Sequence, residues 1–282
     1  MVFRSRERLE IKTPEQVRLM RAAGLVVAQA LAAVREAVAV GVTTAELDAV
    51  AEAVIRAAGA TPSFIGVPGG PGVQDFPASL CTSVNDEVVH GLPGSRSLRS
   101  GDVVSIDCGA VLDGWHGDAA ITVPVGEVPD DVRRLLEVTE DSLWHGLAAV
   151  RPGGRLSDVS AAVESCVRKG GAYGLVEDYV GHGIGTQMHM APSVPNLGKP
   201  GKGPRLVPGL AIAVEPMVNL GTAETSVLDD GWTVVTDDSA PSAHFEHTVA
   251  VTPSGPWVLT ALDGGRTQLA RLGVQVSSEQ SP

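Results

Sequence analysis

Short apolar runs, separated by glycine, proline and charged residues, divide the chain into strands and helices. The clearest run, Val103–Ile106, predicts a buried strand that ends in a carboxylate, Asp107. Asp113 and Gly114 form a hairpin-turn signal, and a second carboxylate, Asp118, leads into another strand over residues 120–125. The pattern therefore predicts two carboxylates at one end of a sheet. Asp is also common in turns, and for Asp113 we adopt that interpretation.

Helices are marked by capping residues at their starts and by glycines at their ends. Thr13, Pro14 and Gln16 make a helix start with a capping box, and this helix is expected to run to about residue 40. Thr44 is the expected cap of a second helix that ends at about residue 58. Two further helices are expected at about 129–150 and 157–169, and short strands at 79–84, 210–214, 232–236 and 244–251.

Two parts of the chain resemble each other in the same order, which indicates an internal repeat. LDAVAEAV matches LSDVSAAV, GDVVSID matches GLAIAVE, HGLP is echoed by HMAP, and DAAITV resembles EHTVAV. Each match alone is weak, but their shared order is hard to attribute to chance. The repeat predicts a single domain of two related αβ halves, whose strands converge on a pseudo-two-fold axis. Four carboxylates are expected to project toward that axis: Asp107, Asp118, Glu215 and Glu246.

Composition narrows the class of protein. The chain has 282 residues, of which 44% are hydrophobic and 19% charged, as in an ordinary soluble globular protein. A net charge of −12 argues against a protein that binds nucleic acid by neutralising phosphates. Three cysteines without a C-x-x-C spacing indicate a reducing compartment. The N-terminus lacks the apolar core of a signal peptide, and the apolar run Ala22–Val34 is too short to span a membrane. We expect a cytoplasmic protein.

Clustered carboxylates cannot all stay ionised without cations. Oxygen ligands suit Mg, Mn or Fe, and one added imidazole moves the preference toward Mn, Fe, Co or Zn. His182 lies between glycines in the segment GHGIG, where the backbone can approach a site closely, so we take it as the imidazole ligand. A lone histidine is otherwise more often a hydrogen-bonded core residue. The expected solution is a pair of divalent ions about 3.5–4 Å apart, bridged by carboxylates.

In these motifs and in their order, the chain resembles the type I methionine aminopeptidases of the pita-bread metallopeptidase fold, over about residues 13–262. The matching segments are CTSVNDEVVHGLP, SIDCGA, GWHGDAA, GHGIG followed by MHMAP, AVEPMV and FEHTVAVT. The resemblance implies an α+β fold with two pseudo-symmetric αβ halves around a central curved antiparallel sheet. It implies one catalytic domain, residues 13–265, between a short N-terminal segment (1–12) and a C-terminal tail (266–282).

The implied activity is removal of the initiator methionine from nascent proteins and peptides whose second residue is small. Two divalent cations (Fe, Mn, Co or Zn) would activate the attacking water. Asp118 and Glu246 would bridge the two ions, Asp107 would chelate one of them, and His182 with Glu215 would complete the other. The implied partners are nascent polypeptide N-termini, with transient contact with the ribosome, for a protein that is a monomer and binds neither nucleic acid nor membrane.

The resemblance also implies roles for residues around the ions. Glu215 would be the general base. His189 would hydrogen-bond the scissile carbonyl and its developing oxyanion, and His90 would contact the amide nitrogen of the second residue. The methionine side chain would lie against residues that by themselves are also ordinary core residues: Cys81, Phe76 and Trp232, with Met188 nearby.

The chain departs from the family pattern at several positions. A Gly-rich insertion, Gly66–Gly72, lies near the expected pocket, and Ala119 stands where a hydroxyl residue is common. Met190 replaces a Glu, and His244 stands where Gln is frequent. None of these changes removes a ligand, so they bear on substrate preference and turnover.

Two alternatives remain at this point. An Xaa-Pro aminopeptidase or prolidase has the same metal ligands but usually a large additional N-terminal domain, whereas here about a dozen residues precede the first helix. A pita-bread binding protein without catalysis would typically have lost ligands, and all five are present here.

Overall fold

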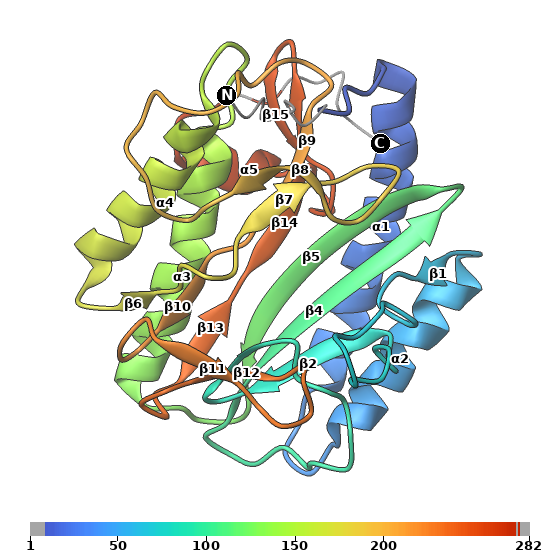
Figure 1. The fold of residues 1–282 in the computed structure, drawn as a ribbon, viewed down its shortest axis with the longest axis vertical. Helices are drawn as coiled ribbons and strands as arrows, with labels where there is room; N and C mark the ends of the chain where they lie inside the picture. Colours follow the sequence, from blue (N-terminus) through green and yellow to red (C-terminus); the bar gives the residue numbers. More distant parts are fainter. Residues whose placement is uncertain (1–8, 275, 277–282) are drawn as a thin grey trace.

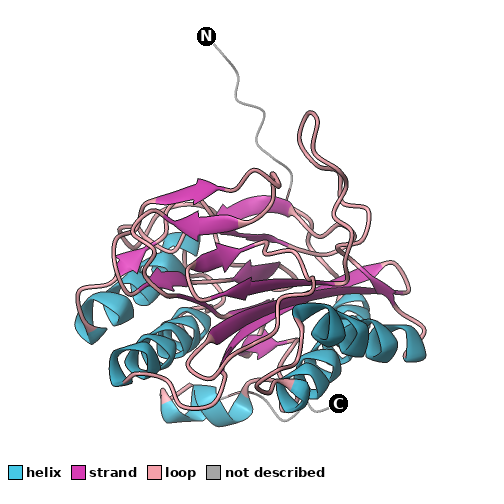
Figure 2. Ribbon diagram, turned by 90° about the horizontal axis from the view of Figure 1, so that it is seen from below, coloured by secondary structure: helices cyan, strands magenta, loops and turns pink. Residues whose placement is uncertain are grey.

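The computed structural model describes residues 9–274 and residue 276, and in it a curved sheet carries the helices on one side (Figures 1 and 2). The helices are α1 (Pro14–Ala37), α2 (Thr44–Ala57), α3 (Asp130–Ala148), α4 (Leu156–Gly170) and α5 (Arg266–Arg271). The strands are β1 (Thr61–Pro62), β2 (Leu80–Val84), β3 (Glu87–Val89), β4 (Val103–Leu112), β5 (Trp115–Pro124), β6 (Gly174–Leu175), β7 (Gly181–Gly183), β8 (Met190–Val194), β9 (Ala211–Val214), β10 (Met217–Asn219), β11 (Thr225–Val227), β12 (Val234–Thr236), β13 (Ser242–His244), β14 (Glu246–Thr252) and β15 (Gly255–Val258).

The main sheet has the order β1-β4-β5-β14-β9-β7-β8, with β2 beside β4 and β15 beside β14. All of these pairings are antiparallel. β5 and β14 meet at the middle, with β4 flanking one and β9 flanking the other, so the two halves of the chain correspond across this junction. The repeat read from the sequence therefore corresponds to a pseudo-two-fold arrangement of strands.

Each half has its own apolar core on the helical side of the sheet. α1 packs on α2, β4 and β5, on the right in Figure 1, while α3 packs on α4 and on strands of the second half, on the left. Ile106 is fully buried in the first core and Val249 in the second. The helices thus cover the convex face and leave the opposite face of β5 and β14 for polar side chains.

Helix α1 is long and apolar enough to cross a membrane by length and composition alone. In this protein its apolar face is covered by the sheet, and residues such as Met20 and Val27 have no exposed surface. The contact is so close that a Cβ on Gly117 of β5 would lie 2.8 Å from the Gly24 Cα of α1. The apolar character of α1 is therefore explained by packing in the core.

Two local expectations were wrong in detail. The cap of α2 is Thr43, not Thr44, because a capping box places its Glu three residues after the cap, and Glu46 bonds Thr43 at both the backbone and the side chain. Asp107 lies in the middle of β4 and does not end it, because the strand continues to the turn at Asp113. That turn has the two positive φ angles of a type I′ hairpin, 50° at Asp113 and 79° at Gly114, as the sequence predicted.

The expected C-terminal tail contains a helix that the sequence did not reveal. α5 begins at the first residue of that tail, and its Leu269 is fully buried in the core of the second half. Residues 275 and 277–282 of the tail, and residues 1–8 of the N-terminal segment, lie outside the described part of the chain. The boundary at residue 265 therefore does not separate packed chain from unpacked chain.

Candidate metal centre

Three carboxylates surround Ala120 at the centre of the sheet. In the antiparallel register Ala120 lies opposite Asp107 of β4 on one side and opposite Glu246 of β14 on the other. Asp118 is two residues before Ala120 in β5, and residues two apart in a strand point to the same face. Cross-strand partners also share a face. The register alone therefore directs Asp107, Asp118 and Glu246 to one point on the concave side.

The second half adds a carboxylate and an imidazole. Val214, the last residue of β9, pairs with His247, so the next residue, Glu215, comes beside Glu246. His182 is the central residue of β7, and its Nε2 lies 3.5 Å from Glu215 Oε1 and 3.8 Å from Asp118 Oδ2. Ligand atoms of Asp118, His182 and Glu246 all lie within 4.8 Å of one another. The five residues expected as ligands thus line one cavity.

The donor set fits a divalent cation. Within the described part of the chain, Asp107 Oδ1, Asp118 Oδ1 and Glu246 Oε1 are buried and accept no hydrogen bond. Buried carboxylates without a partner are costly, and a cation is the partner that satisfies several at once. His182 Nδ1 lies 3.0 Å from Gly183 O, so its N–H is engaged there and the Nε2 lone pair is left for a metal.

The electrostatics agree with this fit. Burial, followed by the charge of neighbouring carboxylates, raises the pKa of Asp118 and Glu246 well above the usual values. Burial raises the pKa of Asp107 to about 7, and burial together with Asp107 raises the pKa of Glu215 to about 8. Burial lowers the pKa of His182 to about 4, so its imidazole is neutral at pH 7, the form that ligates metals. Without a cation the centre holds protons, and a cation would displace them.

This same cavity has a volume of about 70 Å³ and carries aromatic side chains beside the carboxylates, so we call it the aromatic cavity. Phe76 packs edge-on against Phe64 and Trp232, with ring centroids 6.2 and 5.1 Å apart. Trp232 is held by a hydrogen bond of 2.9 Å from its Nε1 to Gln74 O. Cys81 pairs with Asp107 in the β2–β4 ladder, and burial raises the pKa of its thiol, so the side chain is a neutral, soft wall.

Sequence reasoning missed two walls of this cavity, Phe64 and Val67. Phe64 is the second residue after β1 and belongs to one apolar cluster with Phe76 and Met188. Val67 lies inside the Gly-rich loop, which the sequence marked only as unusual. The available signal was that both are apolar residues within a Gly/Pro-rich segment, where exposed polar residues are the rule.

Two further histidines face the cavity. The rings of His189 and His182 lie 4.5 Å apart in an edge-on arrangement, and the His90 ring lies 5.7 Å from Tyr179. His90 has a positive φ of 61°, which turns the chain into Gly91, where a Cβ would lie 2.4 Å from Thr82 O. Burial lowers the pKa of both histidines, for His90 to about 4, so both are neutral donors or acceptors at pH 7.

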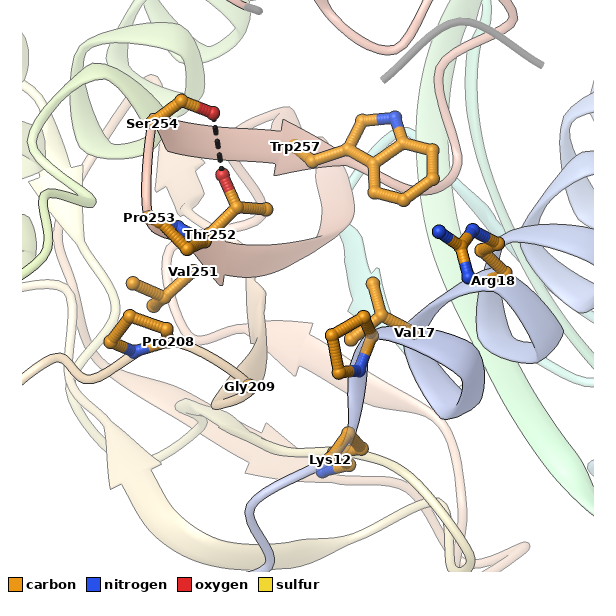
Figure 3. A pocket seen from close by; sticks show the side chains of 11 residues that line it. Lys12, Val17, Arg18, Pro208, Gly209, Val251, Thr252, Pro253, Ser254 and Trp257 are labelled. Atoms are coloured by element: carbon orange, nitrogen blue, oxygen red, sulfur yellow. Dashed lines mark hydrogen bonds between the residues drawn. The ribbon is translucent and has the colours of Figure 1, made fainter. Parts of the chain in front are cut away.

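A larger cavity of 450 Å³ lies elsewhere, between the start of α1 and the β14–β15 hairpin (Figure 3). Its cations are already engaged: Lys12 Nζ donates to Ile184 O, and Arg18 pairs with Glu15 at 2.8 Å. Among the described residues that line it, none carries a carboxylate, a thiol or an imidazole. Its walls are mostly apolar, with Trp257 beside Val17 in Figure 3. The chemistry therefore belongs to the smaller cavity at the sheet centre.

Known proteins match this arrangement. The model of Metallopeptidase family M24 matches residues 18–253. "Methionine aminopeptidase 1" of Mycobacterium tuberculosis is 52% identical over 264 residues, which cover 92% of this chain and 97% of that protein. The crystal structure of methionine aminopeptidase from Rickettsia prowazekii has a TM-score of 0.85 and 40% identity, covering 90% of this chain and 100% of that one.

The pita-bread fold that the resemblance implied is confirmed by these structures. The prolidase from Pyrococcus furiosus has a TM-score of 0.69 at 21% identity, covering 89% of this chain and 65% of that one. At that identity the prolidase shares the fold and no more. The two proteins described above that match over almost their whole length, at 52% and 40% identity, are methionine aminopeptidases.

Proposed function

This chain belongs to metallopeptidase family M24, and from that premise we propose that it removes the initiator methionine from new polypeptides whose second residue is small. The observation that carries the proposal is that five side chains able to hold metal ions and a group of aromatic side chains line one cavity. We assign this activity to residues 13–265, the unit that contains the family match at 18–253.

We assign the roles of the ligands as the family resemblance implies them. Asp118 and Glu246, from the two central strands, would bridge two divalent ions, with Asp107 on one ion and His182 with Glu215 on the other. When bound, such a pair supplies a water of lowered pKa and an electrophilic contact for the scissile carbonyl. Fe, Mn, Co and Zn are all compatible with four carboxylates and one imidazole.

The surrounding residues bind and orient the substrate. The methionine side chain would lie among Phe64, Phe76 and Trp232, since contacts between sulfur and an aromatic ring are worth about 0.3–1.5 kcal/mol. His189 would donate a hydrogen bond to the carbonyl oxygen as negative charge develops there. His90 would contact the amide nitrogen of the second residue, and Glu215 would accept the proton of the attacking water.

The close approach of the scissile amide to His90 and to the carboxylates explains a preference for a small second residue. A bulky side chain there would displace the carbonyl, and a displacement of 1 Å can cost roughly 10²-fold in rate. We place the activity in the cytoplasm on a monomer that acts on nascent N-termini, with transient contact with the ribosome.

The test is hydrolysis of Met-X-Gly peptides that differ only in X, with Mn, Fe, Co and Zn supplied in turn to the chelated protein. We expect Met-Ala and Met-Ser to be cleaved and Met-Leu and Met-Lys to be slower by about 10²-fold or more. Equal rates for Met-Leu and Met-Ala would remove the proposed gate. Cleavage of Ala-Pro peptides in preference to Met-Ala would indicate an Xaa-Pro aminopeptidase, and metal binding without any hydrolysis would indicate a binding protein.

A further inference from the structure

His244 is a buried imidazole beside the metal centre that none of the roles above uses. It ends β13, and only 2% of its surface is exposed. Within the described part of the chain its Nε2 is buried and has no hydrogen-bond partner. The carboxylate next to it is Glu215, whose Oε2 lies 4.0 Å from that Nε2.

The backbone of His244 is held from two directions. Thr122 Oγ1 accepts a hydrogen bond of 2.9 Å from His244 N and donates one of 2.7 Å to His244 O. In the β10–β13 ladder, His244 pairs with Met217, two residues after Glu215. Glu215 lies in the short connection from β9 to β10. The pairing of β10 with β13 therefore places His244 close to Glu215. These contacts fix the backbone position from which the imidazole reaches Glu215.

Glu215 consequently lies between two imidazoles. Its Oε1 is 3.5 Å from His182 Nε2, and its Oε2 faces His244 Nε2. A buried donor or acceptor left unsatisfied costs about 1–3 kcal/mol, and this cost favours a hydrogen bond between His244 Nε2 and the carboxylate that faces it. Residues that hold a ligand from outside the coordination shell commonly orient it and tune its affinity for the metal.

We propose that His244 is a positioning residue, whose Nε2–H donates to Glu215 Oε2 and keeps Oε1 directed toward His182 and the metal. The proposal rests on the assignment of Glu215 as a metal ligand. It also gives a physical reason for tolerating His where the family resemblance leads one to expect Gln, because the Gln side chain carries an amide N–H donor as well.

The test measures the affinity of the metal-free protein for Mn²⁺ by calorimetric titration. This measurement does not depend on turnover. His244→Leu keeps the volume and removes the donor, and we expect its affinity to fall about 10–100-fold. His244→Gln restores a donor, so its affinity is expected to stay within about threefold of the original protein. Thr236→Val is the matched control, because it removes a part-buried hydrogen bond of 2.8 Å to Ala240 O away from the cavity, and its affinity should be unchanged.

A double-mutant cycle separates positioning from a general loss of structure. In a Glu215→Gln background, His244→Leu should produce no further loss of affinity, because the carboxylate it positions is gone. Equal losses in both backgrounds, or an unchanged affinity in His244→Leu alone, would show that His244 does not act through Glu215. If Glu215→Gln itself kept full metal affinity and hydrolysis, the ligand assignment would be wrong, and this proposal would fall with it.

Discussion

Gly109→Ala tests whether the aromatic cavity holds the methionine side chain. Gly109 lies in β4 opposite Asp118, and its backbone conformation is one that alanine adopts without strain, since its φ is not positive. An added Cβ would lie 2.7 Å from Met188 Cε and 3.0 Å from both Phe64 Cε1 and Ser63 Cβ. These distances are shorter than van der Waals contact. Met188, whose Cε is the flexible end of its side chain, would have to move.

Two free energies set the expected fall of kcat/KM in Gly109→Ala. Overpacking of a close-packed site costs about 1–3 kcal/mol. Full burial of a methionine side chain is worth about 1.5–3 kcal/mol, which sets the most that exclusion from the cavity can cost. Because 1.4 kcal/mol is a factor of ten, we expect kcat/KM for a Met-Ala peptide to fall about 10–100-fold.

The assay compares kcat/KM, metal content and thermal unfolding for Gly109→Ala and for Gly94→Ala. Gly94 is the control because a Cβ there meets nothing within 4 Å and no positive φ is involved. Metal content should be unchanged in both variants, since neither removes a ligand. An unchanged kcat/KM in Gly109→Ala would refute the placement of the substrate side chain beside Phe64 and Met188. A loss of metal would show that the change acts on Asp118 instead.

Three further predictions concern the centre itself. Asp118→Asn and Glu246→Gln should each abolish hydrolysis by preventing a bridged pair of ions, and near-normal turnover with full metal content in either variant would exclude bridging. His189→Ala should bind metal normally and lose about 10²–10³-fold in kcat, whereas a parallel fall in metal content would make His189 a ligand. In protein from which a chelator has removed metal, burial raises the pKa of Asp107 to about 7 and of Glu215 to about 8. The folded state therefore holds protons that the unfolded state has released, and these protons stabilise it. That stabilisation is lost as pH rises through those values. The Tm of the metal-free protein should therefore fall from pH 7 to 8.5, and saturating divalent cation should reverse that trend because its ligands must be deprotonated; a metal-free Tm that rises over this range would contradict the shifts.

The sequence was sufficient to predict that four carboxylates meet, because each of them lies within a pattern that repeats. Asp107 and Glu215 end matching apolar runs, and Asp118 and Glu246 begin matching ones, so their meeting at an axis follows from the duplication. The exact place of Asp107 within its strand did not follow, since periodicity does not mark where a strand continues past a polar residue. The structure shows that the strand runs five residues further, to Leu112.

Other features depend on contacts that no local pattern records. Phe64 becomes a cavity wall only because β1 pairs with β4 and brings it beside Phe76. α5 has six residues and no side-chain cap, so it lacks the signals that mark longer helices, and it is held by the burial of Leu269. The position of His244 beside Glu215 likewise depends on the pairing of β13 with β10. Such long-range pairings are set by the whole sheet.

The central position of β14 also determines when, during synthesis, this enzyme can first become active. β14 lies between β5 and β9, although it follows β5 by more than a hundred residues in the chain. Until it emerges, β5 and β9 each have an open edge, which is a template for pairing with other chains. Asp107 and Asp118 meanwhile belong to a half-built site without Glu246. A shortened chain that ends before β14 should therefore gain no partial activity, and the incomplete protein is the form most exposed to aggregation.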